Sequence, residues 1–190
     1  FVSCSVCAKE RVVFRCDFDS AATQGSGEGK MVSGFEGGRS LLIERANKGI
    51  TSRRFTIPAA KFDDRFVRLE AVVKAEGVSE PPDSWNGIKV MLVFQTESGA
   101  RHYPQVRIPV GGFDWKHFSE TIRIPKNVKY VQLVVGLEKV SGRAWFDDLK
   151  VTVGRPEKKG RRNETKFTGH DLPRLRGVMH GPEFREGDIR

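Results

Sequence analysis

Tyr130-Val-Gln-Leu-Val-Val-Gly-Leu-Glu138 is the most regular stretch of this sequence. Its alternate residues are apolar, namely Val131, Leu133, Val135 and Leu137, and Tyr130, Gln132 and Glu138 stand between or beside them. Successive side chains of a β-strand point to opposite faces, so this period of two predicts a strand with one buried and one polar face.

The same alternation recurs along most of the chain, and no helical period is sustained for three turns. Further strands are expected at residues 67–73, 88–94, 118–124 and 145–153, with shorter ones at 12–18, 40–44, 51–57 and 103–108. Glycine and proline, the residues that turns need, separate these segments. The pattern predicts an all-β fold, an antiparallel β-sandwich over residues 11–153.

Length and charge limit the class of protein. The 190 residues suffice for one domain with an extension, and no run approaches the roughly 18 apolar residues of a membrane span. The net charge of +9 suggests nucleic-acid binding, but it divides into 23 basic and 18 acidic residues up to 153 and 10 basic and 6 acidic after it. Without a basic helix or stripe, we expect neither a nucleic-acid nor a membrane partner.

Both ends of the chain differ in composition from its middle. Residues 1–10 resemble the end of a secretory leader, which predicts export to the outside of a bacterial cell, although Cys4 and Cys7 leave a redox or metal pair as an alternative. Residues 154–171 are basic and poor in apolar residues, as in a linker. Residues 172–190 predict a strand, a turn and the start of a helix, the opening of a truncated β/α domain.

Three segments carry a resemblance to a known family. They are Gly38-Arg-Ser-Leu-Leu-Ile-Glu44, Phe113-Asp-Trp-Lys-His-Phe118 and Gly142-Arg-Ala-Trp-Phe-Asp-Asp-Leu-Lys-Val151. Their order and spacing resemble the jelly-roll carbohydrate-binding modules of families 4, 9 and 22. Leu175-Arg-Gly-Val-Met-His-Gly181 in turn resembles the first barrel strand of a family 5 glycoside hydrolase of the cellulase type. Together the resemblances imply a non-catalytic module of a secreted hydrolase that binds β-glucan, xylan or mannan.

The residues themselves offer no catalytic pair. Glycoside hydrolysis needs two carboxylates about 5 to 9.5 Å apart, and Asp147 and Asp148 are neighbours whose side chains should leave a strand on opposite faces. We therefore expect no catalysis by this chain, with the catalytic carboxylates of the hydrolase lying beyond Arg190.

The resemblance implies a structural Ca²⁺ that joins the first strand to the last. Carboxylate oxygens suit Ca²⁺, and the candidate metal ligands are Asp17, Asp19, Asp147 and Asp148, with Asp19 and Asp148 as the main contributors. The alternative is that these acids merely end strands and cap turns.

A sugar site needs a flat apolar surface and planar polar groups. Trp85 lies in a loop after Pro81-Pro82, and Tyr103 begins a strand that carries Gln105 and Arg107 on the same face. We expect these residues to form a concave face with the polar side of strand 130–138 and with Glu70 and Arg68. The candidate carbohydrate-binding residues are Trp85, Tyr103, Gln105, Arg107, Tyr130, Gln132, Glu138 and Glu70. Trp115 and Trp145 are expected in the core.

A second hypothesis of a different class remains open. The chain contains few candidate surface aromatics, which also fits a structural β-sandwich domain that packs on the catalytic barrel without binding sugar.

Overall fold

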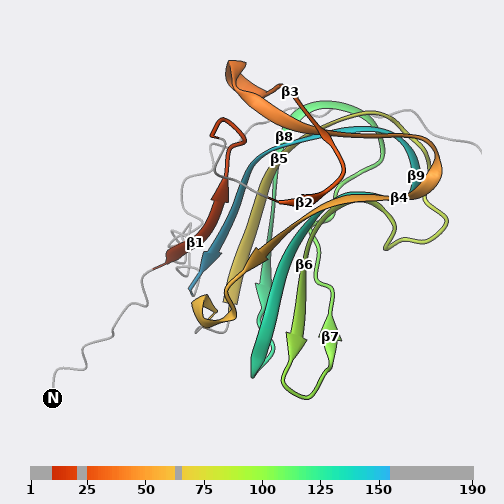
Figure 1. Ribbon diagram of the computed structural model, residues 1–190. Coiled ribbons are helices and arrows are strands. Elements are labelled where there is room, and N and C mark those ends of the chain that lie inside the picture. The colour runs from red at the N-terminus through yellow and green to blue at the C-terminus, as the bar shows by residue number, and fades with distance from the viewer. Residues whose placement is uncertain (1–9, 21–24, 63–65, 155–190) are drawn as a thin grey trace, which may run out of the picture. The chain divides into compact units, whose positions relative to one another are not determined.

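The structure is a computed structural model that describes residues 10–20, 25–62 and 66–154 (Figure 1). Antiparallel strands make up nearly all of this part. They are β1 (Arg11–Cys16), β2 (Ser26–Gly27), β3 (Lys30–Ser33), β4 (Arg39–Ile57), β5 (Phe66–Val78), β6 (Gly87–Thr96), β7 (Arg101–His102), β8 (Gly111–Arg123) and β9 (Val128–Val153). Two 3₁₀ turns, η1 (Phe35–Gly37) and η2 (Ala59–Lys61), lie between them.

Two long strands, β4 and β9, take part in both layers of the fold. The pairing of β4 with β9 shifts register between Arg45 and Gly49, opposite residues 140–142 of β9. Lys139 and Gly142 have φ angles of +54° and +124°, which bend β9 there. The Arg45 guanidinium holds the bend of β4, because it donates to the carbonyls of Asn47 and Ile50 and to Thr51 Oγ1.

On either side of these bends the strands form two sheets. The first sheet contains residues 142–153 of β9, flanked by β5 and β8 on one edge and by β1 and the start of β4, with β3, on the other. The second sheet contains residues 128–140 of β9 between the end of β4, with β2, and β6, with β7.

The inward side chains of both sheets form one hydrophobic core. Leu69, Val73 and Phe146 come from the first sheet, and Leu92 and Leu133 come from the second. All are fully buried, as the alternation of apolar residues predicts. The predicted all-β fold is confirmed: the described residues form a two-layered antiparallel β-sandwich of the jelly-roll class.

Most expected strands are present, but segment 103–108 is not a regular strand. Only Arg101–His102 pair with β6, followed by a single bridge between Gln105 and Met91. Pro104 lacks the backbone N–H that a ladder requires. The segment still follows β6, because Leu92 N–H donates to Pro104 O and Val106 N–H donates to Val90 O, each at 2.9 Å.

Trp115 and Trp145 lie outside the core, contrary to expectation. Trp115 is half-buried and packs against Phe35 of η1, with ring centroids 5.8 Å apart. Trp145 lies on the outer face of the first sheet, where Lys74 and Arg143 lie 5.5 and 5.7 Å from its ring. A period-two pattern does not say which face of a strand a neighbouring turn will cover, and here η1 packs against Trp115.

The predicted boundaries at both ends are not tested. The expected leader remnant at residues 1–10, the linker at 154–171 and the barrel start at 172–190 lie outside the described residues, apart from Glu10 and Gly154. In the described part, no helix is long and apolar enough to span a bilayer.

Gly136 allows β4 to approach β9 closely in the second sheet. A Cβ at this position would lie 2.2 Å from Thr51 O and 2.8 Å from Ser52 Cα, which are backbone atoms. We expect Gly136→Ala to lower the free energy of unfolding by about 1–3 kcal/mol, because the two strands must separate. Urea unfolding measures the change.

Gly112→Ala is the matched control, because its added Cβ would have no neighbour closer than Ala75 O at 3.7 Å. We expect a change within about 0.5 kcal/mol for this variant. Equal losses in the two variants would contradict the role of the close approach at Gly136.

Candidate functional site

The outer face of the second sheet carries the polar residues that alternate with the core. On β9 they include Tyr130, Gln132 and Glu138, and on β6 they include Lys89 and Gln95. We call the outer side of residues 50–56, 87–95 and 130–138 the polar face. Transverse rows follow from the register: Arg54, Val134, Met91 and Gln105 form one row, and Ile50, Glu138 and Gly87 form another.

One buried ammonium joins four segments at the end of this face. Lys89 is 6% exposed, and its Nζ donates to the carbonyl oxygen of Trp85 and, at 2.8 Å, to Gln105 Oε1. The same Nζ forms an ion pair with Glu138 Oε2 at 2.7 Å. Gln105 Nε2 also donates to the Trp85 carbonyl, at 3.2 Å. Burial of a charge is costly unless it is paired, and Lys89 has three acceptors.

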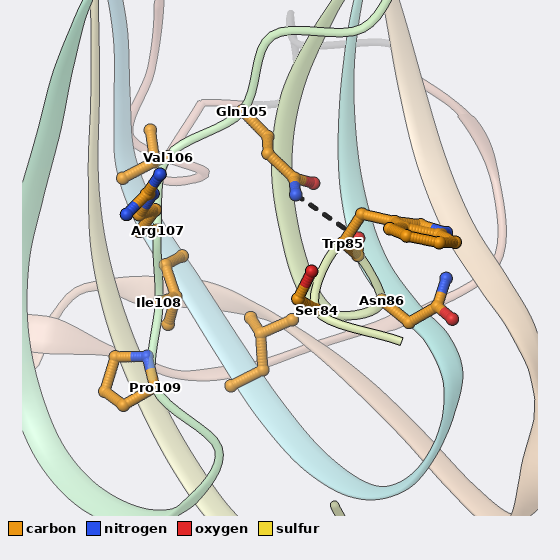
Figure 2. Close-up of a pocket in the computed structure, with 9 residues that line it drawn as sticks. Ser84, Trp85, Asn86, Gln105, Val106, Arg107, Ile108 and Pro109 are labelled. Atoms are coloured by element: carbon orange, nitrogen blue, oxygen red, sulfur yellow. Dashed lines mark hydrogen bonds between the residues drawn. The ribbon is translucent and has the colours of Figure 1, made fainter. Parts of the chain in front are cut away.

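The network fixes the backbone of Trp85 but leaves its indole free. Trp85 is 61% exposed, and its indole points away from segment 105–109 (Figure 2). The loop before it is tied down by Asn86 N–H, which donates to Asp83 O at 2.9 Å, and by Lys139, whose Nζ lies 3.7 Å from Asp83 Oδ2. A large aromatic side chain on a rigid loop is therefore presented to solvent.

A hollow of about 750 Å³ lies between this loop and segment 105–109 (Figure 2). Ser84, Trp85 and Asn86 line one side, and the residues from Gln105 to Pro109 line the other. Both polar atoms of the Asn86 side chain, Oδ1 and Nδ2, are buried and have no hydrogen-bond partner in the described structure. These are unused hydrogen-bonding groups beside Trp85.

The structure brings together most of the predicted sugar-binding residues. Trp85, Gln105 and Glu138 meet at Lys89, and Tyr130 and Gln132 lie farther along the same face of β9. Arg107 lines the hollow. Tyr103, 55% exposed, lines another hollow with Phe94, His102 and Arg123 among others.

Glu70 does not belong to this face. It lies on β5 in the first sheet and is buried on that sheet's outer side, where Lys150 Nζ lies 2.9 Å from its Oε2 and Arg68 Nε lies 3.4 Å from its Oε1. His117 Nε2 is 3.5 Å from the same Oε1. The expectation that Glu70 and Arg68 join the sugar-binding face is wrong, because alternation predicts an outward side chain but not the sheet to which it belongs.

Lys89 is the site residue that sequence analysis missed. It lies between the apolar Ile88 and Val90, so the alternation places it on the same outer face as Glu138. The outward position of Lys89 was therefore visible in the sequence. The local pattern does not show that β6 pairs with β9, and this pairing brings the Lys89 ammonium to a carboxylate 49 positions away in sequence.

The acidic candidates gather around η1 and the end of β9. Asp147 Oδ2 accepts a hydrogen bond from Phe35 N–H at 3.1 Å, and its Oδ1 accepts one from Asp148 N–H at 2.7 Å. Burial raises the pKa of Asp147 above its usual value, and the nearby charges of Asp19 and Asp148 raise it further. Backbone hydrogen bonds from Asp148 and Phe35 oppose these effects.

The remaining acids have separate partners. Asp19 Oδ1 accepts a hydrogen bond from Arg39 N–H at 2.7 Å, and Asp17 Oδ1 accepts one from Asp19 N–H at 3.2 Å. Asp148 is at a bulge with φ of +38°, and its Oδ1 lies 3.3 Å from Arg15 Nη2. Within the described ranges, no group of three or more His, Cys, Asp or Glu side chains is placed to hold a metal ion.

Comparison with known proteins establishes the fold. No protein-family model matches the chain, and no curated sequence matches it. Among solved structures, the C-terminal family 22 carbohydrate-binding module of Clostridium thermocellum Xyn10B superposes with a TM-score of 0.57 at 18% identity, over 75% of this chain and 93% of that one. The first such module of Paenibacillus barcinonensis Xyn10C, a xylan-binding domain, gives 0.57 at 13% identity, over 76% and 96%.

A third similar structure contains more than the module. It is the C. thermocellum Xyn10B fragment in which a family 22 module and a family 10 hydrolase module are complexed with xylohexaose. The TM-score is 0.58 at 16% identity, and the match covers 76% of this chain but 29% of the longer one.

Removal of the Lys89 ammonium should loosen the site. Lys89→Met leaves the Glu138 carboxylate without its cation and Gln105 Oε1 without its donor, so we expect a loss of about 2–3 kcal/mol in the free energy of unfolding. Lys74→Met on the first sheet is the control, because its ion pairs are longer, at 3.8 and 3.9 Å, and should contribute less than about 1 kcal/mol. Chemical denaturation of the three proteins compares them, and similar losses would contradict a special role for Lys89.

Proposed function

We propose that this chain is a carbohydrate-binding module that holds chains of a β-glucan or a xylan on the polar face of its second sheet. The observation that carries this proposal is the exposed indole of Trp85 on a loop that Lys89 and Gln105 hold in place. An exposed aromatic ring on a fixed stretch of backbone offers the flat apolar surface against which the C–H face of a pyranose ring packs.

Hydrogen bonds to the sugar hydroxyls come from neighbouring side chains in this proposal. Glu138 uses Oε2 for Lys89, so that Oε1 remains available as an acceptor, and the side chain is 30% exposed. Gln132 lies on the same face of β9. Gln105 is different, because both ends of its amide are engaged by Lys89 and Trp85, and it acts by positioning the loop.

The similarity to xylan-binding modules supports the proposed ligand class, since those modules share the fold of this chain. In keeping with the family 22 module that accompanies a family 10 hydrolase module, we propose that this module is secreted as part of a glycoside hydrolase. Its contribution would be to raise the effective concentration of the enzyme at its polymer, without catalysis by the described residues.

A structural Ca²⁺ is a further part of the proposal. Asp147 and Asp19 would hold it, with its other oxygens supplied by backbone carbonyls or water. The support is that the Asp147 carboxylate is already oriented by two backbone N–H groups, while burial and, to a smaller extent, the negative charges of Asp19 and Asp148 destabilise its ionised form. A divalent cation would neutralise this repulsion and tie the segment of Asp19, which follows β1, to β9.

Loss of the Trp85 ring should abolish binding. In affinity electrophoresis on gels that contain xylan, mixed-linked β-glucan or mannan, we expect retardation of the native chain by at least one polymer and a loss of at least about tenfold in affinity for Trp85→Ala. Tyr103→Ala tests whether the hollow that Tyr103 lines also contacts the polymer. Trp145→Ala, which removes an indole from the opposite sheet, is the matched control and should retain binding.

Two outcomes would contradict the proposal. Retardation by no glycan would favour the structural-domain hypothesis, and an equal loss in Trp85→Ala and Trp145→Ala would place the ligand elsewhere.

Calcium should stabilise the fold through Asp147. We expect the Tm in 5 mM CaCl₂ to be about 2–8 °C higher than in EDTA. A shift of this size requires a Ca²⁺ concentration well above the dissociation constant of the site. Because burial raises the pKa of Asp147, this effect should disappear on acidification at a higher pH than for an ordinary aspartate. Asp147→Asn should abolish the shift, and Asp114→Asn on exposed β8 should preserve it. An unchanged Tm in Ca²⁺ would refute the site.

A further inference from the structure

Three adjoining hollows follow segment 103–109 at the edge of the sandwich. The first is the hollow beside Trp85, which Gln105 and Arg107 also line. The second is lined by Pro104, Gln105 and Arg107 on one side and by residues 120–123 of β8 on the other. The third contains Tyr103 and Pro104 with Arg123 and Lys126. Shared lining residues make the three hollows one continuous edge, which we call the 103–109 edge.

This edge carries positive charges that no carboxylate neutralises. Arg107, Arg123 and Lys126 line the hollows, and within the described part of the chain none of them has a carboxylate oxygen within 4 Å. One acid, Glu120, lines the middle hollow. The three cations therefore leave a local excess of positive charge beside an exposed tyrosine ring.

The outer face of the first sheet shows the opposite arrangement. There Arg68, Lys74, Arg143 and Lys150 each lie between 2.7 and 3.8 Å from a carboxylate of Glu70 or Glu76. Even the buried Lys89 on the polar face is matched by Glu138. Unmatched guanidinium groups at the 103–109 edge thus contrast with these four cations of the first sheet and with Lys89, each of which has a carboxylate partner.

We infer that the 103–109 edge binds the carboxylate of an acidic sugar, so that the preferred ligand is a glycan chain with uronic acid substituents. This inference rests on the proposed function, and it names the substrate class of the extended site. A guanidinium group matches a carboxylate in shape and can donate two parallel hydrogen bonds. Tyr103 and Trp85 supply apolar surfaces on which sugar rings pack.

The geometry favours a substituted neutral chain over a polyanion. The row from Arg54 to Gln105 leads across the polar face to the 103–109 edge, so one chain can lie across the face and present a side group to Arg107 or Arg123. Nucleic acids carry a phosphate at every nucleotide and require a continuous basic track. Glu120 in the middle hollow and Glu138 on the face interrupt such a track.

The decisive experiment compares one polymer with and without its charge. Glucuronoxylan and the same glucuronoxylan after reduction of its carboxyl groups to alcohols are titrated against the full 190-residue chain by calorimetry at 20 mM and 500 mM NaCl. We expect about three- to tenfold tighter binding of the acidic form at low salt, and a smaller difference at high salt, where exposed ion pairs are screened.

Substitutions test whether the preference for the acidic polymer depends on the arginines of the 103–109 edge. Arg107→Gln and Arg123→Gln should each reduce the preference for the acidic polymer and together abolish it. Arg123 does not line the hollow beside Trp85, so Arg123→Gln alone should keep the affinity for the reduced polymer within about twofold. Arg39→Gln is the matched control, because it removes the same charge from an exposed arginine of the first sheet. It should leave the preference unchanged.

The outcomes separate this inference from the proposed function. Equal binding of both polymers, lost in Trp85→Ala, would overturn the inference and leave the proposed function standing. Binding of the acidic polymer that survives Trp85→Ala but not the arginine substitutions would support the edge and contradict the Trp85 site. Binding of neither polymer would overturn both. Tighter binding of a DNA or RNA fragment than of glucuronoxylan, through the same arginines, would also overturn the inference.

Discussion

The backbone pairing of β9 is the constraint on which this structure depends. One continuous strand of 26 residues supplies the inner strand of both sheets, and it pairs with β1, β4, β5 and β6. Because one strand enters both layers, a one-residue shift of register anywhere along β9 would move core side chains of one sheet to its outer, solvent-facing side. The glycines at its bend and at its close approach to β4 are therefore part of the same constraint.

The same strand also places two carboxylates, those of Glu138 and Asp147, in different sheets. Glu138 precedes the bend and points to the polar face, whereas Asp147 follows the bend and lies beside η1. Each is a carboxylate at reduced exposure, but their surroundings differ. Glu138 has an ammonium partner at 2.7 Å, whereas Asp147 has only backbone N–H donors and lies near other carboxylates. The charge of Glu138 is already balanced by Lys89, whereas the charge of Asp147 has no such partner among the described residues, so a bound cation would stabilise the Asp147 carboxylate.

Local pattern predicted the strands well because apolar alternation directly reflects burial on one face. Val131, Leu133 and Leu137 are buried as predicted, and Trp85 is exposed as its loop position suggested. The errors concern which elements meet. Glu70 points outward as predicted, but from the other sheet, and Trp115 is half-buried because η1 packs against it. Segment 103–108 has alternating residues, but Pro104 prevents a full ladder. Long-range pairing determines the first two features, and no local period encodes it. The third was visible in the sequence as Pro104, which the alternation of the neighbouring residues masked.

Pairing likewise determines what the positive charge of the chain can do. A net charge of +9 is a property of composition, and by itself it names no ligand. On the outer face of the first sheet, Arg143 and Lys150 are held by Glu76 and Glu70, so these two cations contribute little field beyond their partners. At the 103–109 edge, Arg107 and Arg123 have no such partner among the described residues, and they line hollows beside an exposed Tyr103. A charge that a neighbouring carboxylate already neutralises has little attraction left for a ligand, whereas an unmatched guanidinium beside an aromatic ring retains its full capacity to bind an anion. The arrangement of carboxylates, more than the number of arginines, therefore determines where an acidic ligand can bind.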